Sequence, residues 1–244
     1  MKNQFSISIA LLLAVSGVAG CKHAAAPVAL KATATGAAIV ETSGGKQFTP
    51  AGSLLPAPVV VQVNDEAGTA VPGALVHLSG PEGVGFDPAD GLTDTSGQLT
   101  TNVSVGGAAG RYQIVATSTD KAGKAFSLKL DEIALGYQQG LGAELDQKYC
   151  SRCHSSESSA ERVSNYDNLS VKPHLFTDGE TLNKMSDADM LAIITHGGPS
   201  LNKSALMPAY GSTLTKAETQ ALIAYIRLIS DPPYRAAGVV YAQK

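Results

Sequence analysis

The strongest constraint on this chain is a Cys-x-x-Cys-His motif near its middle, formed by Cys150, Cys153 and His154. Two cysteines at this spacing lie about one helical turn apart, so both thiols can reach the same group. The histidine beside the second thiol is then directed at that group from one side. Cys-x-x-Cys-His is the attachment pattern of c-type haem, whose two vinyl groups receive the thiols. The motif predicts one covalent haem c, with His154 as an iron ligand.

Two other chemistries of paired cysteines are disfavoured. A redox dithiol of this spacing usually accompanies a βαβ pattern, but the residues after the motif are typical of helices and loops. A structural zinc site needs further cysteine or histidine ligands at paired spacing, and the chain has only three cysteines. An odd number also argues against a disulfide framework. The third cysteine, Cys21, lies in a different context.

The first 20 residues are typical of an export signal. Lys2 precedes an apolar run, Ile7–Val18, that is shorter than the roughly 20 residues of a membrane-spanning helix. Small residues then lead directly to Cys21, which resembles the lipobox of bacterial lipoproteins. The resemblance implies cleavage before Cys21, a lipid on its thiol, and a membrane anchor in the bacterial cell envelope, on the periplasmic or cell-surface side. The alternative is an ordinary secretory signal followed by a chance cysteine.

Residues 21–36 are small and rich in alanine, and we interpret them as a tether. From residue 37 to residue 132 the pattern changes to short stretches in which apolar and polar residues alternate, separated by turns rich in glycine, proline and aspartate. This pattern predicts an all-β sandwich. His77 should point away from the face of Val76 and Leu78, as a structural residue. The predicted strands are 59–64, 74–78, 99–105, 111–117 and 125–130.

The same region resembles the invasin/intimin-type bacterial immunoglobulin-like repeat. The segments that carry the resemblance are Ser43–Gln47, Leu55–Asp65, Gly68–Val76 and Thr93–Gln98. What the resemblance implies is a rigid spacer or an adhesive module.

The sequence offers five candidates for a second iron ligand, and Met207 is the best of them. Met207 precedes a proline in a loop between two helical segments, and the proline fixes the local backbone. His196 is the main rival, because imidazole also binds haem iron. Methionine commonly fills gaps in a core, which is the role we expect for Met185 and Met190. The fifth candidate is His174.

Residues 140–230 resemble a small class I cytochrome c with one haem, which predicts an all-α domain over residues 133–230. In that family a proline carbonyl, here that of Pro173, accepts a hydrogen bond from the proximal histidine. Gly142 would let the first helix approach the last helix, 217–229, closely. A position that is often aromatic holds Asp146 instead, which departs from the family pattern. Residues 231–244 begin Asp-Pro-Pro, which ends the last helix, and could fold back as an arm.

These features point to electron transfer. The formal net charge is -3, so the chain lacks the basic character expected of a nucleic-acid partner. With both axial positions occupied by His154 and Met207, the haem would carry single electrons between redox partner proteins, without catalysis and without a small-molecule substrate. One alternative is the haem subunit of a periplasmic oxidoreductase or a peroxidase-like enzyme. A second alternative is a haem-bearing surface adhesin or sensor.

Overall fold

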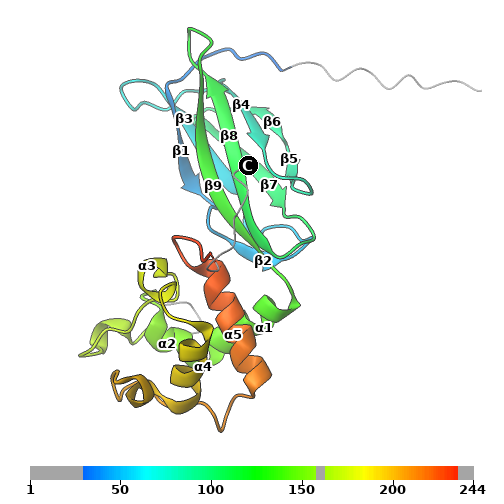
Figure 1. The fold of residues 1–244 in the computed structure, drawn as a ribbon. Helices are drawn as coiled ribbons and strands as arrows, with labels where there is room; N and C mark the ends of the chain where they lie inside the picture. The colour runs from blue at the N-terminus through cyan, green and yellow to red at the C-terminus, as the bar shows by residue number, and fades with distance from the viewer. Residues whose placement is uncertain (1–29, 158–162, 236–244) are drawn as a thin grey trace, which may run out of the picture.

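A computed structural model describes residues 30–157 and 163–235 of the chain (Figure 1). The predicted export signal and Cys21 lie outside the described residues. Within the described ranges no helix has both the length and the apolar character needed to cross a membrane. The predicted order, an all-β immunoglobulin-like sandwich followed by an all-α domain, is confirmed.

The sandwich consists of two packed sheets with antiparallel pairing throughout, except where β2 lies parallel to β9. The first sheet has the order β1-β3-β7-β5, with β1 (Ala38–Ser43), β3 (Val59–Asn64), β7 (Gln98–Ser104) and β5 (Gly85–Asp87). The second has the order β2-β9-β8-β4-β6, with β2 (Phe48–Pro50), β9 (Ala125–Leu135), β8 (Gly110–Thr119), β4 (Leu75–Ser79) and β6 (Asp90–Leu92).

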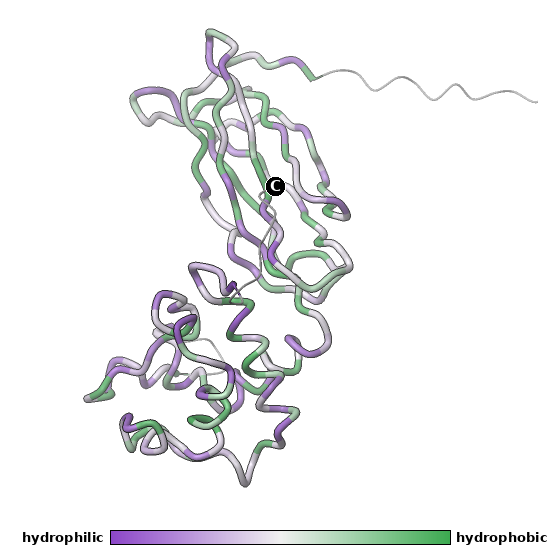
Figure 2. Tube along the Cα trace, viewed as in Figure 1, coloured by the Kyte–Doolittle hydropathy of each residue, from purple (hydrophilic) through white to green (hydrophobic). Residues whose placement is uncertain are grey.

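The core of the sandwich follows the predicted alternation. Every second residue of β3 is buried, because successive side chains of a strand point to opposite faces. In β4, Val76 and Leu78 are buried and His77 between them is exposed, as predicted. The hydropathy colouring shows green segments along the sandwich that alternate with pale and purple ones (Figure 2).

Among its described residues, the helical domain has five α-helices, one π-helical turn and two 3-10 turns. Its elements are α1 (Tyr137–Leu145), η1 (Asp146–Cys150), α2 (Ser151–His154), η2 (Tyr166–Asn168), α3 (Gly179–Leu182), α4 (Asp187–His196), η3 (Gly198–Leu201) and α5 (Lys216–Ile229). Helix α5 begins with a capping box, in which Thr215 and Glu218 bond each other's backbone N–H groups.

Helices α1 and α5 cross at Gly142, as the sequence indicated. A Cβ at this position would overlap the carbonyl oxygen of Ala221 and the Cβ of Tyr225. Leu222 and Tyr225 are both buried in the core of the helical domain. Leu145 is buried in the same core, one turn after the crossing. A glycine is therefore required for the first and last helices to pack this closely.

The two domains meet without a linker. Strand β9 continues to Leu135, beyond the predicted boundary at Glu132, and α1 begins at Tyr137. Ile133 of β9 is buried in the core of the helical domain, and Phe48 of β2 packs edge-on against the ring of Tyr225 at 6.5 Å between centroids. The sandwich is thus fixed against the helical domain by apolar contacts.

Arg111 of β8 adds polar contacts to this junction. Its guanidinium donates hydrogen bonds to the carbonyls of Leu228, Ile229 and Ser230, at 3.2, 3.1 and 2.6 Å. These carbonyls at the end of α5 have no partner within the helix, and a cation is favourable there. The sandwich therefore caps the last helix of its neighbour.

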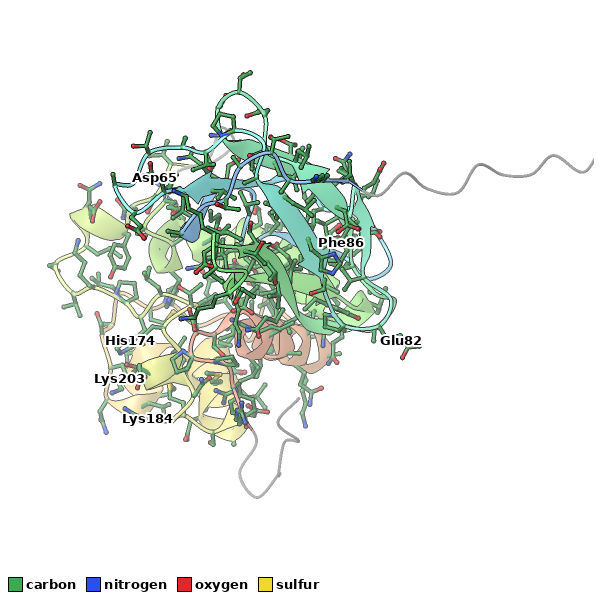
Figure 3. The ribbon with its side chains drawn as sticks, turned by 90° about the horizontal axis from the view of Figure 1, so that it is seen from above. Asp65, Glu82, Phe86, His174, Lys184 and Lys203 are labelled. Atoms are coloured by element: carbon green, nitrogen blue, oxygen red, sulfur yellow. The ribbon has the colours of Figure 1, made fainter. Side chains whose placement is uncertain are left out.

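The chain enters and leaves the sandwich at opposite ends. The N–H groups of Thr33 and Ala34 bond the carbonyl of Gly73 at the end far from the helices, and β9 leads into α1 at the other end (Figure 1). Viewed along the sandwich, the helical domain extends beyond its outline, so His174, Lys184 and Lys203 are not hidden behind it (Figure 3). The described start of the C-terminal tail, Asp231, pairs with Gly179 of α3.

Candidate functional site

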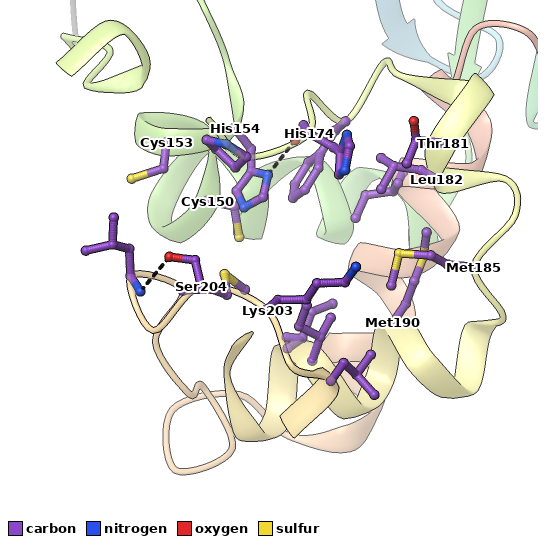
Figure 4. Close-up of a pocket in the computed structure, with 18 of the residues that line it drawn as sticks. Cys150, Cys153, His154, His174, Thr181, Leu182, Met185, Met190, Lys203 and Ser204 are labelled. Atoms are coloured by element: carbon purple, nitrogen blue, oxygen red, sulfur yellow. Dashed lines mark hydrogen bonds between the residues drawn. The ribbon is translucent and has the colours of Figure 1, made fainter. Parts of the chain in front are cut away.

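The candidate site is an apolar cavity inside the helical domain, between the Cys-x-x-Cys-His motif and the loop that carries Met207 (Figure 4). Its volume is about 540 Å³, within the range of about 300–1,000 Å³ that is usual for cofactor sites. Cys150, Cys153, His154 and Met207 all line it. The structure thus brings together the four side chains that the sequence predicted to bind haem.

The motif lies where the first helix changes its winding. Helix α1 passes into a single π-helical turn, η1, which ends at Cys150, and the following turn α2 carries Cys153 and His154. Such turns are rare and often mark functional sites. Cys150 is buried and Cys153 is partly exposed. Burial raises the pKa of the Cys150 thiol to about 12, so the thiol is protonated at neutral pH.

His154 is held in one orientation by two contacts. Its Nδ1 donates a hydrogen bond to the carbonyl of His174 at 2.7 Å, since a carbonyl can only accept. The ring also stacks on Phe176, with 4.6 Å between centroids. Burial lowers the pKa of His154, which favours the neutral ring. Nε2 then keeps its lone pair, as an iron ligand requires.

The acceptor of this hydrogen bond differs from the prediction. The resemblance to class I cytochromes assigned it to the carbonyl of Pro173, but the structure places the carbonyl of His174 there. The imidazole of His174 bonds Asp178, at 3.0 Å, and Asp178 caps helix α3. His174 therefore bonds Asp178 through its ring and His154 through its carbonyl. Pro173 still lines the cavity as its neighbour.

Met207 lines the cavity from a loop that two glycines allow to lie against the end of α4. The N–H of Gly198 donates to the carbonyl of Met207 at 3.0 Å. Gly197 has a φ of +82°, which favours glycine, and a Cβ on Gly198 would overlap the carbonyl of Ser204. Sequence reasoning missed the role of these glycines, because their contact with the loop is tertiary.

The remaining candidates for a second ligand do not share this position. His196 ends α4 with an exposed side chain and does not line the cavity. Met185 and Met190 line it at the end away from the cysteines and belong to the core of the domain, as expected for packing residues (Figure 4). His174 contributes its carbonyl to His154, while its ring pairs with Asp178.

Arg227 of α5 holds the segment that carries Met185. Its guanidinium donates to the carbonyls of Leu182 and Met185 at 2.7 and 2.6 Å and pairs with Asp187 at 2.8 Å. The arginine side chain is only 8% exposed, so these bonds lie in a low-dielectric region where they are strong. The wall between α3 and α4 is thereby tied to the last helix.

The residues present fit a haem group. The lining is mostly apolar, as a porphyrin requires, with two thiols at one end. A neutral imidazole and a thioether stand on different walls, and this pair of ligands is the one that cytochromes c use.

Comparison with known proteins agrees with this fit. Residues 138–226 match the sequence model of the family described as cytochrome c oxidase, cbb3-type, subunit III. The matched segment contains the whole candidate site and begins one residue into α1. No curated protein gives a significant match to the chain.

Solved structures similar to this chain include bacterial adhesins. The D00-D0 and D0-D1 domains of intimin are 14% and 16% identical to it, over 40% and 42% of this chain and 46% and 49% of theirs, with TM-scores of 0.31 and 0.32. The adhesin InvE of Yersinia pseudotuberculosis is 14% identical, over 39% of this chain and 31% of its own, with a TM-score of 0.29.

The matched region spans less than half the length of each of these adhesin structures. At these TM-scores the likeness adds nothing to the fold assignment, which rests on the strand pairing within the sandwich. The sequence match and the geometry of the cavity agree for the helical domain. The chain therefore carries a cytochrome c domain after an immunoglobulin-like sandwich.

Proposed function

We propose that this protein is a membrane-anchored c-type cytochrome that passes single electrons between redox partner proteins through one haem c. Cys150 and Cys153 would hold the haem covalently, and His154 and Met207 would be its axial ligands. The observation that carries this proposal is the cavity, in which these four side chains meet although Met207 is more than fifty residues from the motif.

The chemistry that the haem supplies is a ferrous/ferric couple, and a thioether ligand favours its ferrous form. The chain's own residues prepare the site for this role. The carbonyl of His174 orients His154, and hydrogen bonds to histidine ligands of this kind tune the metal. The apolar lining keeps water away. With both axial positions filled, no position would remain open for oxygen or peroxide.

The course of the chain supports a spacer role for the sandwich. The lipobox-like segment before Cys21 predicts a lipid anchor, and the described chain enters the sandwich at the end opposite to the cytochrome domain (Figure 1). Strand β9 has 11 residues at about 3.4 Å each, so the sandwich separates its two ends by about 35 Å. The haem domain would stand at that distance from the anchored end, where redox partners can reach it.

The axial ligand can be tested with Met207→Ala. The wild type, matured with haem, should give a low-spin c-type spectrum and bind no carbon monoxide in its ferrous form. The variant should become high-spin and bind carbon monoxide, because one axial position opens. Met185→Ala, which removes a methionine from the same cavity, should keep the wild-type spectrum. A Met207→Ala protein with an unchanged spectrum would overturn the assignment, and rapid carbon monoxide binding by the wild type would favour an enzyme.

The anchor requires a separate experiment. Full-length protein should partition into the membrane fraction, and Cys21→Ser should release it while the haem spectrum stays the same. Mass spectrometry of the membrane form should find acyl chains on Cys21. Recovery of unmodified wild-type protein in the soluble fraction would contradict the lipid anchor and leave the cytochrome assignment intact.

A further inference from the structure

Two lysines belong to the lining of the cavity, Lys203 with its side chain directed away from the cysteines and Lys184 next to Met185 in the chain. Lys184 follows α3, on the same segment as Met185, and Lys203 follows η3; both line the cavity. Cys150 and Cys153 occupy one end in Figure 4, and the ammonium group of Lys203 extends toward the other end, where Met185 lies. Figure 3 shows both lysines on the same side of the helical domain.

The backbone holds Lys203 at this place. Asn202, just before it, adopts a left-handed conformation with φ +55°, which turns the chain back. The N–H of Lys203 then donates to the carbonyl of Gly198 at 2.9 Å. Lys184 is fixed in a similar way, because its N–H donates to the carbonyl of Thr181 at 3.1 Å. Both side chains therefore start from ordered turns.

Neither lysine has an anionic partner among the described residues. Lys172, which also lines the cavity, pairs with Asp167 at 3.8 Å, and His174 pairs with Asp178. The carboxylate Asp189 is at the same rim, but it accepts a hydrogen bond from Ser186 at 2.8 Å. No ion pair is formed by Lys184 or Lys203 in the described part of the chain.

In a haem c, the two vinyl groups that receive the thiols lie on the half of the ring opposite to the two propionates. Thiols at one end of the cavity therefore direct two carboxylates to the other end. We propose that Lys184 and Lys203 bind these haem propionates. This inference rests on the proposed function and assigns residues to a part of the haem other than its iron and thioether bonds.

Such an arrangement affects the redox equilibrium as well as binding. Reduction adds one negative charge to the haem, and nearby positive charges stabilise the reduced form. The two ammonium groups also offset the propionate charges, which would otherwise favour the ferric form. Lys184 and Lys203 thus raise the midpoint potential of the haem. They are positioning residues for the cofactor and do not contact the iron.

The experiment is to measure midpoint potentials of haem-loaded full-length variants by spectroelectrochemistry. Lys184→Gln/Lys203→Gln should favour the ferric form about fivefold, a fall of about 40 mV at 59 mV per tenfold change for one electron. Lys184→Arg/Lys203→Arg should restore the wild-type potential, because the charges return. Lys216→Gln, which removes an exposed lysine that does not line this cavity, should leave the potential unchanged. Resonance Raman bands of the propionates should shift in the double glutamine variant alone.

One result would overturn the inference: a haem-loaded double glutamine variant whose potential equals that of Lys216→Gln. If that variant also exchanges electrons more slowly with an acidic redox partner, the lysines belong to partner docking instead. A pyridine haemochrome assay comes first, because it tests the proposed function separately from the role of the lysines. Absence of covalent haem from the wild type and from every variant would refute the proposed function itself.

Discussion

The sandwich and the helical domain are stabilised in different ways. The sandwich has a continuous core of aliphatic side chains between its two sheets. Val59 and Ile114, for example, are completely buried there. The helical domain has short helices, two of only four residues, arranged around a cavity of about 540 Å³. The sandwich core consists of packed side chains, whereas the side chains of the helical domain surround a cavity.

This difference explains how one chain combines a support and a cofactor site. A bound haem would contact the apolar lining of this cavity, and the junction through Arg111 and Ile133 links the helical domain to the sandwich.

The largest effect is expected when covalent haem attachment is prevented. Cys150→Ala/Cys153→Ala should lose the haem spectrum, and trypsin should then degrade the helical domain while the sandwich survives as a fragment. Limited proteolysis with mass spectrometry would show this. Arg152→Gln changes the exposed residue between the two cysteines and should behave as the wild type. If the double variant resists trypsin throughout, the helical domain does not depend on its cofactor.

A second effect concerns the sandwich and its pH dependence. Glu132 is completely buried, and burial raises its pKa to about 7, although the N–H of Gln47 donates to its carboxylate. Between the ordinary carboxyl pKa and 7 the folded protein keeps a proton that the unfolded chain has lost. Sandwich stability should therefore fall as pH rises through this window, by up to about 3 kcal/mol.

The Glu132→Gln variant should lose this pH dependence. Urea unfolding would measure it, either on the sandwich fragment that trypsin is expected to release or on the full chain. At pH 8 the variant should be more stable than the wild type. Glu66→Gln, at an exposed hairpin turn, is the matched control and should retain the dependence. Equal pH profiles for Glu132→Gln and the wild type would refute the assignment to Glu132.

A third effect is a difference in stability between alanine substitutions at two glycines of α1. Gly142→Ala introduces a Cβ that overlaps Ala221, and such overpacking typically costs about 1–3 kcal/mol. Gly140→Ala meets no heavy atom within 4 Å and should stabilise α1 by about 0.5–1 kcal/mol, because alanine favours a helix. Thermal unfolding of the helical domain would measure both changes. The two substitutions should change the free energy of unfolding in opposite directions. Equal changes would mean that close packing at Gly142 does not contribute to the stability of the helical domain.

The smallest effect is expected at the junction. Arg111→Gln removes hydrogen bonds from a charged guanidinium to the end of α5. A hydrogen bond from a charged donor contributes about 1.5–3 kcal/mol to stability. Partial replacement by the glutamine amide should reduce the loss in the helical domain to about 1 kcal/mol. Lys124→Gln, at the far hairpin, should change neither domain. Hydrogen exchange would locate the change, and increased exchange in the sandwich alone would contradict a capping role.

Local patterns in the sequence determined much of this protein. The alternation along residues 59–64 gave strand β3 with the same bounds, because burial of one sheet face imposes a period of two. The spacing of Cys150, Cys153 and His154 placed three groups on one helical segment. Met207 followed by proline identified the opposite wall, and the capping box at Thr215 marked the start of the last helix.

Other features depended on contacts between distant segments, so only the tertiary structure decided them. The acceptor for His154 is the carbonyl of His174 rather than that of Pro173, and the ring of His174 pairs with Asp178. The junction formed because Arg111 lies beside the end of α5, more than one hundred residues later in the chain. Periodicity and spacing report a residue's immediate neighbours along an element. Which carbonyl faces an imidazole, and which helix end a side chain caps, are determined by how the elements pack.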